Sequence, residues 1–116
     1  MGLAELLRWQ WQGYPVYHRS RTNLLLHIVV VPAFMIGNVA LFVAAFQHSW
    51  LLAAAGLALM LVSIVLQGRG HASEVNPPVP FTGPGNALAR IFLEQWVSFP
   101  RFVASGNWRR ALRDGH

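Results

Sequence analysis

The chain has 116 residues, of which 54% are hydrophobic and only 11% charged, whereas soluble domains carry about 25% charged residues. This composition predicts a single domain over residues 1–116 and excludes the ordinary soluble globular class. All nine basic residues are arginine and the formal net charge is +5. Because the arginines stand beside apolar segments and tryptophans, anionic membrane lipid is the expected partner and nucleic acid is not. The absence of cysteine excludes disulfides and thiolate metal ligands.

An amphipathic helix is predicted over residues 1–12, where leucines and tryptophans alternate with Glu5 and Arg8. Such a helix is suited to the headgroup layer of a membrane. The Gly-Tyr-Pro sequence at residues 13–15 is expected to end it.

Two apolar segments, about residues 24–46 and 50–67, are each long enough to cross a hydrocarbon core of about 30 Å. Pro32 is expected to kink the first segment. Because only residues 47–49 separate the segments, they are expected to form a tight antiparallel hairpin. Small residues four apart, Ala40 with Ala44 and Ala54 with Ala58, would allow close approach, although alanine is common in such helices.

The arginines flank the hairpin and are absent from its turn, so the positive-inside rule places both termini in the cytoplasm. A bacterial inner membrane is the expected location. Four prolines make residues 76–85 irregular, and a second amphipathic helix is predicted over residues 86–99, ended by Pro100. The predicted fold class is an all-α membrane protein, an antiparallel two-helix transmembrane hairpin with N- and C-terminal amphipathic interfacial helices. Packing of a homodimer through the Trp-rich faces is left open.

His27 is the most informative polar residue of the first span, because ionisable side chains inside spans usually serve a function. An interhelical hydrogen bond is the alternative role. At the end of the second span, a backbone that stays helical as far as Glu74 would direct Gln67, His71 and Glu74 from one face. In an antiparallel hairpin the start of the first span and the end of the second lie at the same depth, so His27 and His71 can meet.

His18 is expected to approach this pair from a loop or bent segment, so that His18, His27, His71 and Glu74 converge on one metal ion. Neutral imidazole with carboxylate suits non-haem Fe(II), and Zn or Mn would accept many of the same donors. Three further residues are expected to support the ligands: Asn23, Gln67 and Tyr17. Two alternatives stay open, that the histidines are ordinary membrane-edge residues and that Glu74 pairs with Arg69 or Arg90.

The sequence also resembles a known family over residues 14–78. The resemblance rests on a group of polar residues and prolines: Tyr17-His18, Asn23, His27, Pro32, Gln67, Gly70-His71, Glu74 and Pro77-Pro78. In this combination they are similar to the Mpo1-like family of 2-hydroxy fatty acid dioxygenases.

The resemblance implies an Fe(II)-dependent membrane enzyme that uses O2 for α-oxidation of a long-chain 2-hydroxy fatty acid, shortening it by one carbon. It implies that His18, His27 and His71 are iron ligands, with Glu74 beside them. Arg69 or Arg90 could neutralise the carboxylate of the substrate. Two other functions remain in view: a non-enzymatic two-span membrane module that binds lipid or a partner protein, and another metal-dependent lipid-modifying enzyme, such as a hydrolase or hydroxylase.

Overall fold

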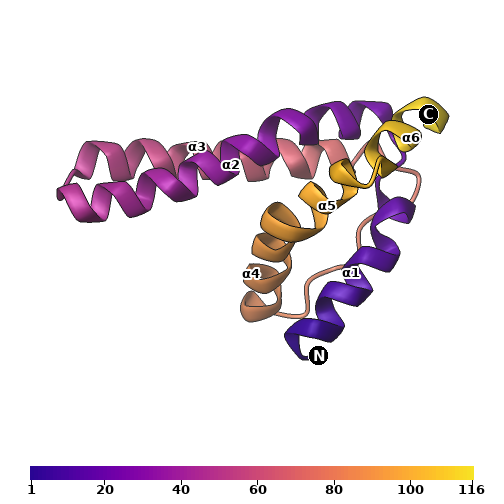
Figure 1. Ribbon diagram of the computed structural model, residues 1–116, viewed down its shortest axis with the longest axis horizontal. Coiled ribbons are helices and arrows are strands. Elements are labelled where there is room, and N and C mark those ends of the chain that lie inside the picture. Colours follow the sequence, from indigo (N-terminus) through magenta and orange to yellow (C-terminus); the bar gives the residue numbers. More distant parts are fainter.

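The computed structural model describes all 116 residues and is entirely helical, as the predicted all-α class requires. Two long helices lie side by side, and the shorter ones gather at one end (Figure 1). Their bounds, in chain order, are α1 (Leu3–Tyr17), α2 (Arg21–Gln47), α3 (Trp50–His71), α4 (Pro84–Leu93), the π-helix η1 (Glu94–Ser98), α5 (Phe99–Ala104) and α6 (Asn107–Asp114). By length and composition, α2 and α3 could each cross a membrane.

Helices α2 and α3 run in opposite directions and are joined by a two-residue turn (Figure 1). His48 takes a left-handed conformation, with φ of 52°, and closes the end of α2 through a bond from its N–H to the Ala44 carbonyl. Ser49 then caps α3, because its hydroxyl accepts a hydrogen bond from the Leu52 N–H at 3.2 Å. Each of the two turn residues thus provides a hydrogen bond to the backbone of one helix end, and the turn needs no further residue.

The closest approach of α2 and α3 is at two glycines. A Cβ at Gly37 would lie 2.7 Å from the Gly56 carbonyl oxygen, and a Cβ at Gly56 would lie 2.9 Å from the Gly37 oxygen. The alanine prediction is wrong for α3, since Ala54 and Ala58 are exposed. Glycine, and not alanine, occupies the closest contact because only the absence of a side chain lets the two backbones touch.

Helix α1 does not end at residues 13–15 as predicted but continues to Tyr17 with Pro15 inside it. Tyr14 is almost fully buried, with its ring 4.9 Å from that of Phe102. The gain from burying this aromatic ring offsets the single hydrogen bond that Pro15 removes.

The C-terminal part also differs from expectation. The helical path does not end at Pro100, because the backbone widens into η1 and resumes as α5, where Pro100 occupies the first turn. Within η1 the Phe99 N–H bonds to the Glu94 carbonyl. Proline has no N–H group to donate, but a position in the first turn of a helix does not require one. The chain can therefore remain helical at Pro100.

Helix α6 and the chain end pack on the start of α2. The Trp108 indole N–H donates to the Leu24 carbonyl at 3.0 Å, and the Arg21 guanidinium donates to the carbonyls of Leu112 and Arg113 at 2.9 Å each. The buried core lies at this junction, in a cluster of five side chains: Tyr14, Leu24, Val31, Phe99 and Phe102. This junction fixes the start of α2 against α1 and α5.

The glycine contact between α2 and α3 predicts a position-specific loss of stability. Gly37→Ala should force the helices apart and lower the free energy of unfolding by about 1 to 3 kcal/mol. Gly68→Ala is the matched control, because a Cβ there meets nothing within 4 Å. Thermal unfolding in detergent measures both, and equal stability of the two variants would contradict this packing.

Candidate metal centre

Three histidines from separate segments meet at the end of the hairpin opposite the His48 turn. His18 lies between α1 and α2, His27 is in the second turn of α2, and His71 is the last residue of α3. Their ring centroids are 4.8 to 5.2 Å apart, and each pair of rings is nearly perpendicular. Because α2 and α3 are antiparallel, the start of one helix adjoins the end of the other and the three rings share one site.

Backbone hydrogen bonds set the direction of two of these rings. His18 Nδ1 lies 2.8 Å from the Tyr14 carbonyl oxygen, and His27 Nδ1 lies 3.0 Å from the Asn23 carbonyl oxygen. A carbonyl only accepts, so each Nδ1 carries the proton and each Nε2 keeps a free lone pair. These two Nε2 atoms are buried without a hydrogen-bond partner, as is Nδ1 of His71.

The fourth donor is Glu94, the first residue of η1. Its Oε1 lies 3.4 Å from His18 Nε2 and 3.7 Å from His27 Nε2. The four potential ligand atoms of His18, His27, His71 and Glu94 all lie within 4.8 Å of one another. Donors at about 2.1 Å from one ion are separated by roughly 3 to 4 Å, so the cluster can hold a metal with little adjustment.

The electrostatics of the cluster favour a charged carboxylate. Burial alone would raise the pKa of the Glu94 carboxyl, but hydrogen bonds and positive charge from His18 and His27, in the metal-free site when their rings are protonated, outweigh burial and hold that pKa well below its usual range. Tyr14 donates its phenolic hydrogen to Glu94 Oε1 at 3.0 Å. Burial and the neighbouring carboxylate raise the pKa of Tyr14 well above its usual value, so the phenol keeps its proton. The site thus offers one anionic oxygen donor beside three imidazoles, which can bind a metal ion once they have lost any added proton.

Tyr14 also supports the cluster by packing. Its ring stacks on His18 at 3.7 Å between centroids, with an interplanar angle of 3°. One side chain therefore holds an imidazole by its face and the carboxylate by a hydrogen bond. Supporting contacts of this kind fix the orientation of metal ligands and tune their basicity.

Glu74 does not join the histidines as expected. Helix α3 ends at His71, so Glu74 leaves the face that Gln67 and His71 share. Its carboxylate accepts hydrogen bonds from the backbone N–H groups of Arg19 and Ser20, at 2.8 and 3.0 Å, and from the Asn23 amide at 2.7 Å. A negative charge is favourable at the start of α2, and this contact ties the end of α3 to it.

The other predicted supporting residues take separate roles. The Asn23 carbonyl orients His27, while its side chain binds Glu74. Gln67 exchanges two hydrogen bonds of 2.8 Å with Gln95, which connects α3 to η1 next to Glu94. Tyr17 lines the adjoining cavity.

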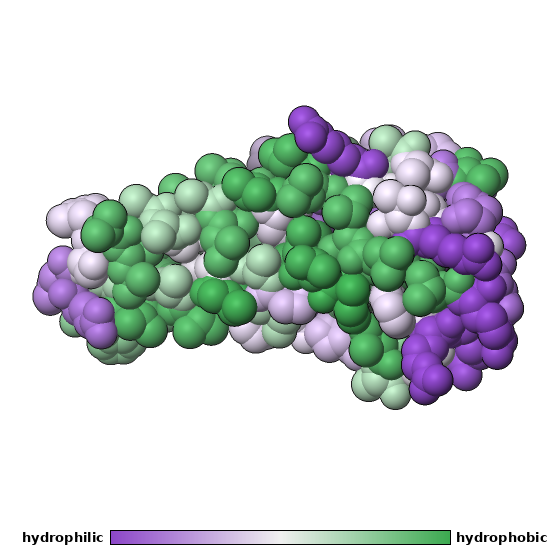
Figure 2. All heavy atoms as spheres, turned by 90° about the horizontal axis from the view of Figure 1, so that it is seen from above, coloured by the Kyte–Doolittle hydropathy of each residue, from purple (hydrophilic) through white to green (hydrophobic).

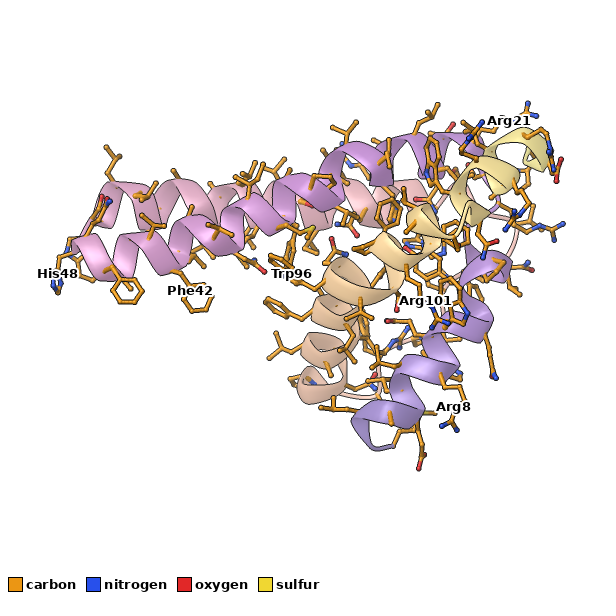
Figure 3. The ribbon with its side chains drawn as sticks, in the orientation of Figure 1. Arg8, Arg21, Phe42, His48, Trp96 and Arg101 are labelled. Atoms are coloured by element: carbon orange, nitrogen blue, oxygen red, sulfur yellow. The ribbon has the colours of Figure 1, made fainter.

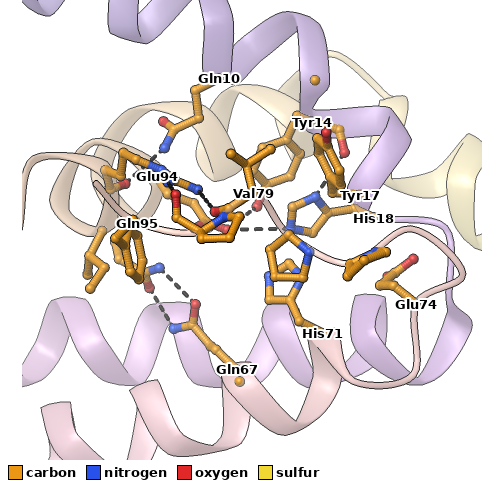
Figure 4. Close-up of a pocket in the computed structure, with 18 of the residues that line it drawn as sticks. Gln10, Tyr14, Tyr17, His18, Gln67, His71, Glu74, Val79, Glu94 and Gln95 are labelled. Atoms are coloured by element: carbon orange, nitrogen blue, oxygen red, sulfur yellow. Dashed lines mark hydrogen bonds and ion pairs between the residues drawn. The ribbon is translucent and has the colours of Figure 1, made fainter. Parts of the chain in front are cut away.

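A cavity of about 720 Å³ adjoins the cluster between α1, α3, α4 and the linker that follows α3 (Figure 4). His18, His71 and Glu94 line it, and Tyr14 and Gln95 lie beside them. Much of the remaining wall is apolar and comes from five side chains: Trp9, Ile64, Val79, Phe81 and Ile91. A ligand can therefore reach the cluster with an apolar part in the cavity.

Sequence reasoning missed Glu94 and Tyr14. The sequence pattern predicts only that Glu94 belongs to an amphipathic helix over residues 86–99 and that Tyr14 lies in a helix-breaking segment. One indication was available, since Glu94 is one of only four acidic residues and stands with Gln95 between apolar stretches. The π-helix that aims it at the histidines has no comparable sequence pattern.

The cluster predicts metal binding that depends on Glu94 and not on Glu74. Purified protein should contain about one transition-metal ion per chain, and His27→Ala or Glu94→Gln should lose most of it. Glu74→Gln should keep the metal while lowering thermal stability, because it weakens the cap of α2. Elemental analysis after detergent purification measures the metal. Retention by Glu94→Gln together with loss in Glu74→Gln would reverse the assignment.

Tyr14→Phe isolates the hydrogen bond to Glu94, because the ring that stacks on His18 remains. We expect metal affinity to fall by about 10- to 100-fold with little change in fold, as for other supporting residues of metal sites. Competition with a chelator measures the affinity, and circular dichroism checks the fold. An unchanged affinity would exclude this role for the phenol.

Comparisons of the chain with protein-family models, with curated proteins and with solved structures found no match.

Proposed function

We propose that this chain is a membrane-embedded non-haem Fe(II) dioxygenase that carries out α-oxidation of long-chain 2-hydroxy fatty acids. The observation that carries the proposal is the set of buried imidazole nitrogens without hydrogen-bond partners, grouped with Glu94. This donor set suits Fe(II), Zn(II) and Mn(II) alike, and the family resemblance of the sequence favours iron.

The placement in a membrane is supported by the surface of the hairpin. Apolar residues cover the middle of the molecule and hydrophilic residues its two ends (Figure 2). Large side chains such as Phe42, Phe46 and Leu61 are exposed on α2 and α3, where lipid would cover them. The arginines lie away from the His48 turn, as Arg8, Arg21 and Arg101 illustrate (Figure 3). In the proposed orientation both termini face the cytoplasm of a bacterial cell.

Helices α1 and α4 would then lie at the cytoplasmic interface of the inner membrane. They branch steeply from the hairpin, and Trp96 just after α4 lies on the same side as Phe42 (Figures 1 and 3). Leu88, Phe92 and Trp96 have exposed side chains. The Trp96 indole reaches Asn38 of α2 with a hydrogen bond of 2.8 Å, which anchors η1 against the hairpin. Amphipathic segments with such aromatic faces are suited to the headgroup boundary.

The cavity, with an apolar wall and a polar cluster at one side, matches the apolar tail and polar head of a 2-hydroxy fatty acid. Its tail would contact the apolar wall that Ile64 and Ile91 help to form, and its oxygen atoms would face the cluster. The cavity volume of about 720 Å³ is within the usual range of 300 to 1,000 Å³ for small-molecule sites. Because the substrate is lipid-soluble, it would enter from the bilayer.

The proposed reaction balances without an external reductant. A 2-hydroxy acid R–CHOH–COOH and one O2 give the acid R–COOH, one CO2 and one water. The bond between C1 and C2 breaks, the substrate loses four electrons and O2 gains them. Fe(II), when bound, supplies the one-electron redox chemistry that no side chain here provides. The protein would orient the donors, through Tyr14 and the Asn23 carbonyl.

Oxygen uptake tests this function. Protein loaded with Fe(II) under nitrogen should consume O2 with 2-hydroxypalmitate and form pentadecanoate in a one-to-one ratio. Palmitate is the control substrate because it lacks the hydroxyl group. His27→Ala should reduce the rate by roughly 100-fold or more, because a metal ligand is lost. An oxygen electrode and mass spectrometry of the products measure both quantities.

Two other outcomes would replace the proposal. Bound metal without oxygen uptake would favour another metal-dependent lipid-modifying enzyme, such as a hydrolase or hydroxylase. Absence of metal in a folded wild-type protein, together with normal folding of His27→Ala and His71→Ala, would favour a non-enzymatic membrane module.

A further inference from the structure

Arg90 is the only arginine among the residues that line the cavity, and the chain has no lysine. It lies on α4, one helical turn before Glu94, and the Glu94 N–H bonds to the Arg90 carbonyl. Residues four apart on a helix project from the same face and are separated by about one turn, or 5 to 6 Å. The guanidinium thus belongs to the same cavity as the metal cluster, close to its carboxylate donor.

The guanidinium of Arg90 makes no direct ion pair, although the Glu94 carboxylate is near enough to attract it. Its Nη1 donates to the Pro80 carbonyl at 3.1 Å and its Nη2 to the Val79 carbonyl at 2.8 Å. The guanidinium carbon also lies 4.5 Å from the ring centroid of Phe81 and 5.0 Å from that of Trp9. No carboxylate lies within 4.0 Å of it. A guanidinium has five N–H donors, so three remain available.

The neutral contacts hold the guanidinium in place before any ligand arrives. Two carbonyls and two aromatic rings restrict a side chain that would otherwise be mobile, and that restriction lowers the entropy lost on binding. A cation held in this way at the wall of an apolar cavity is complementary to one anionic group on an apolar chain. Carboxylate matches the remaining N–H donors particularly well, because two of its oxygens can accept together.

We infer that Arg90 binds the carboxylate of the substrate and makes the cavity selective for free fatty acids over neutral lipids with the same chain. This inference rests on the proposed function, because it assigns the head-group contact at the same site. With the carboxylate on Arg90, about one turn from Glu94, the adjoining C2 carbon and its hydroxyl group face the cluster. Arg90 is therefore a specificity residue, and Arg69 has no part in binding because it does not line the cavity.

Binding to metal-free protein tests the inference separately from catalysis. The 116-residue chain in detergent is treated with EDTA, and its affinity is measured for radiolabelled palmitate and for 1-hexadecanol, which has the same chain without the charge. Arg90→Gln should weaken palmitate binding on the order of tenfold or more, the effect of losing a charge-assisted pair. Binding of 1-hexadecanol should stay within about twofold, and Arg90→Lys should recover part of the loss. Arg69→Gln makes the same charge change in the last turn of α3, outside the cavity, and should leave both affinities unchanged.

Three results would overturn the inference. Wild-type protein could bind palmitate no more tightly than 1-hexadecanol. Arg90→Gln could weaken both ligands equally, which would mean that Arg90 only supports the cavity wall. Arg90→Gln could also leave palmitate binding intact. If oxygen uptake fails while Arg90 still discriminates palmitate from the alcohol, the proposed reaction is wrong and the carboxylate site stands.

Discussion

Three imidazole nitrogens are buried near one another, and no group of the protein donates a hydrogen bond to them. Each buried polar atom without a partner costs about 1 to 3 kcal/mol, so three together would consume a large share of the stability of a small domain. A metal ion converts this cost into binding energy, because each lone pair then has a partner. The carboxylate of Glu94 adds the negative charge that a divalent cation favours.

The fold serves this arrangement by fixing the ends of α2 and α3 together. Glu74 caps the start of α2 from just beyond α3, and Gly70 lies so close to Asn23 that any side chain there would overlap its amide. The Gln67–Gln95 pair then ties α3 to η1 at the residue next to Glu94. Each contact connects segments near the ligands, and together they keep the ends of α2, α3 and η1 side by side.

Part of this structure follows from the sequence and part does not. The two long helices are predictable because their apolar composition persists over the length of a membrane span, and the meeting of His27 with His71 follows from a short turn between them. The fourth donor is not predictable in the same way. Glu74 is closer in sequence to His71, but the end of α3 at His71 turns it toward backbone N–H groups. Tertiary packing of the π-helix η1 places Glu94 beside the histidines, and no spacing of residues along the sequence predicts this placement. The role of Tyr14 is not predictable either. Local preferences around Pro15 predict a break in the helix, whereas burial of the Tyr14 ring keeps α1 helical there.

The proposed position in the membrane gives the cavity its chemical setting, with the apolar helix α3 on one side and the helices α1 and α4 on the other. The central claim is that three histidines and Glu94 bind one metal ion, and X-ray absorption spectroscopy of the iron-loaded protein tests it most directly. The account predicts a single ion with three imidazole ligands, and a spectrum that changes in Glu94→Gln but not in Glu74→Gln. A spectrum with one imidazole or none, or one that is the same in Glu94→Gln as in the wild type, would contradict it.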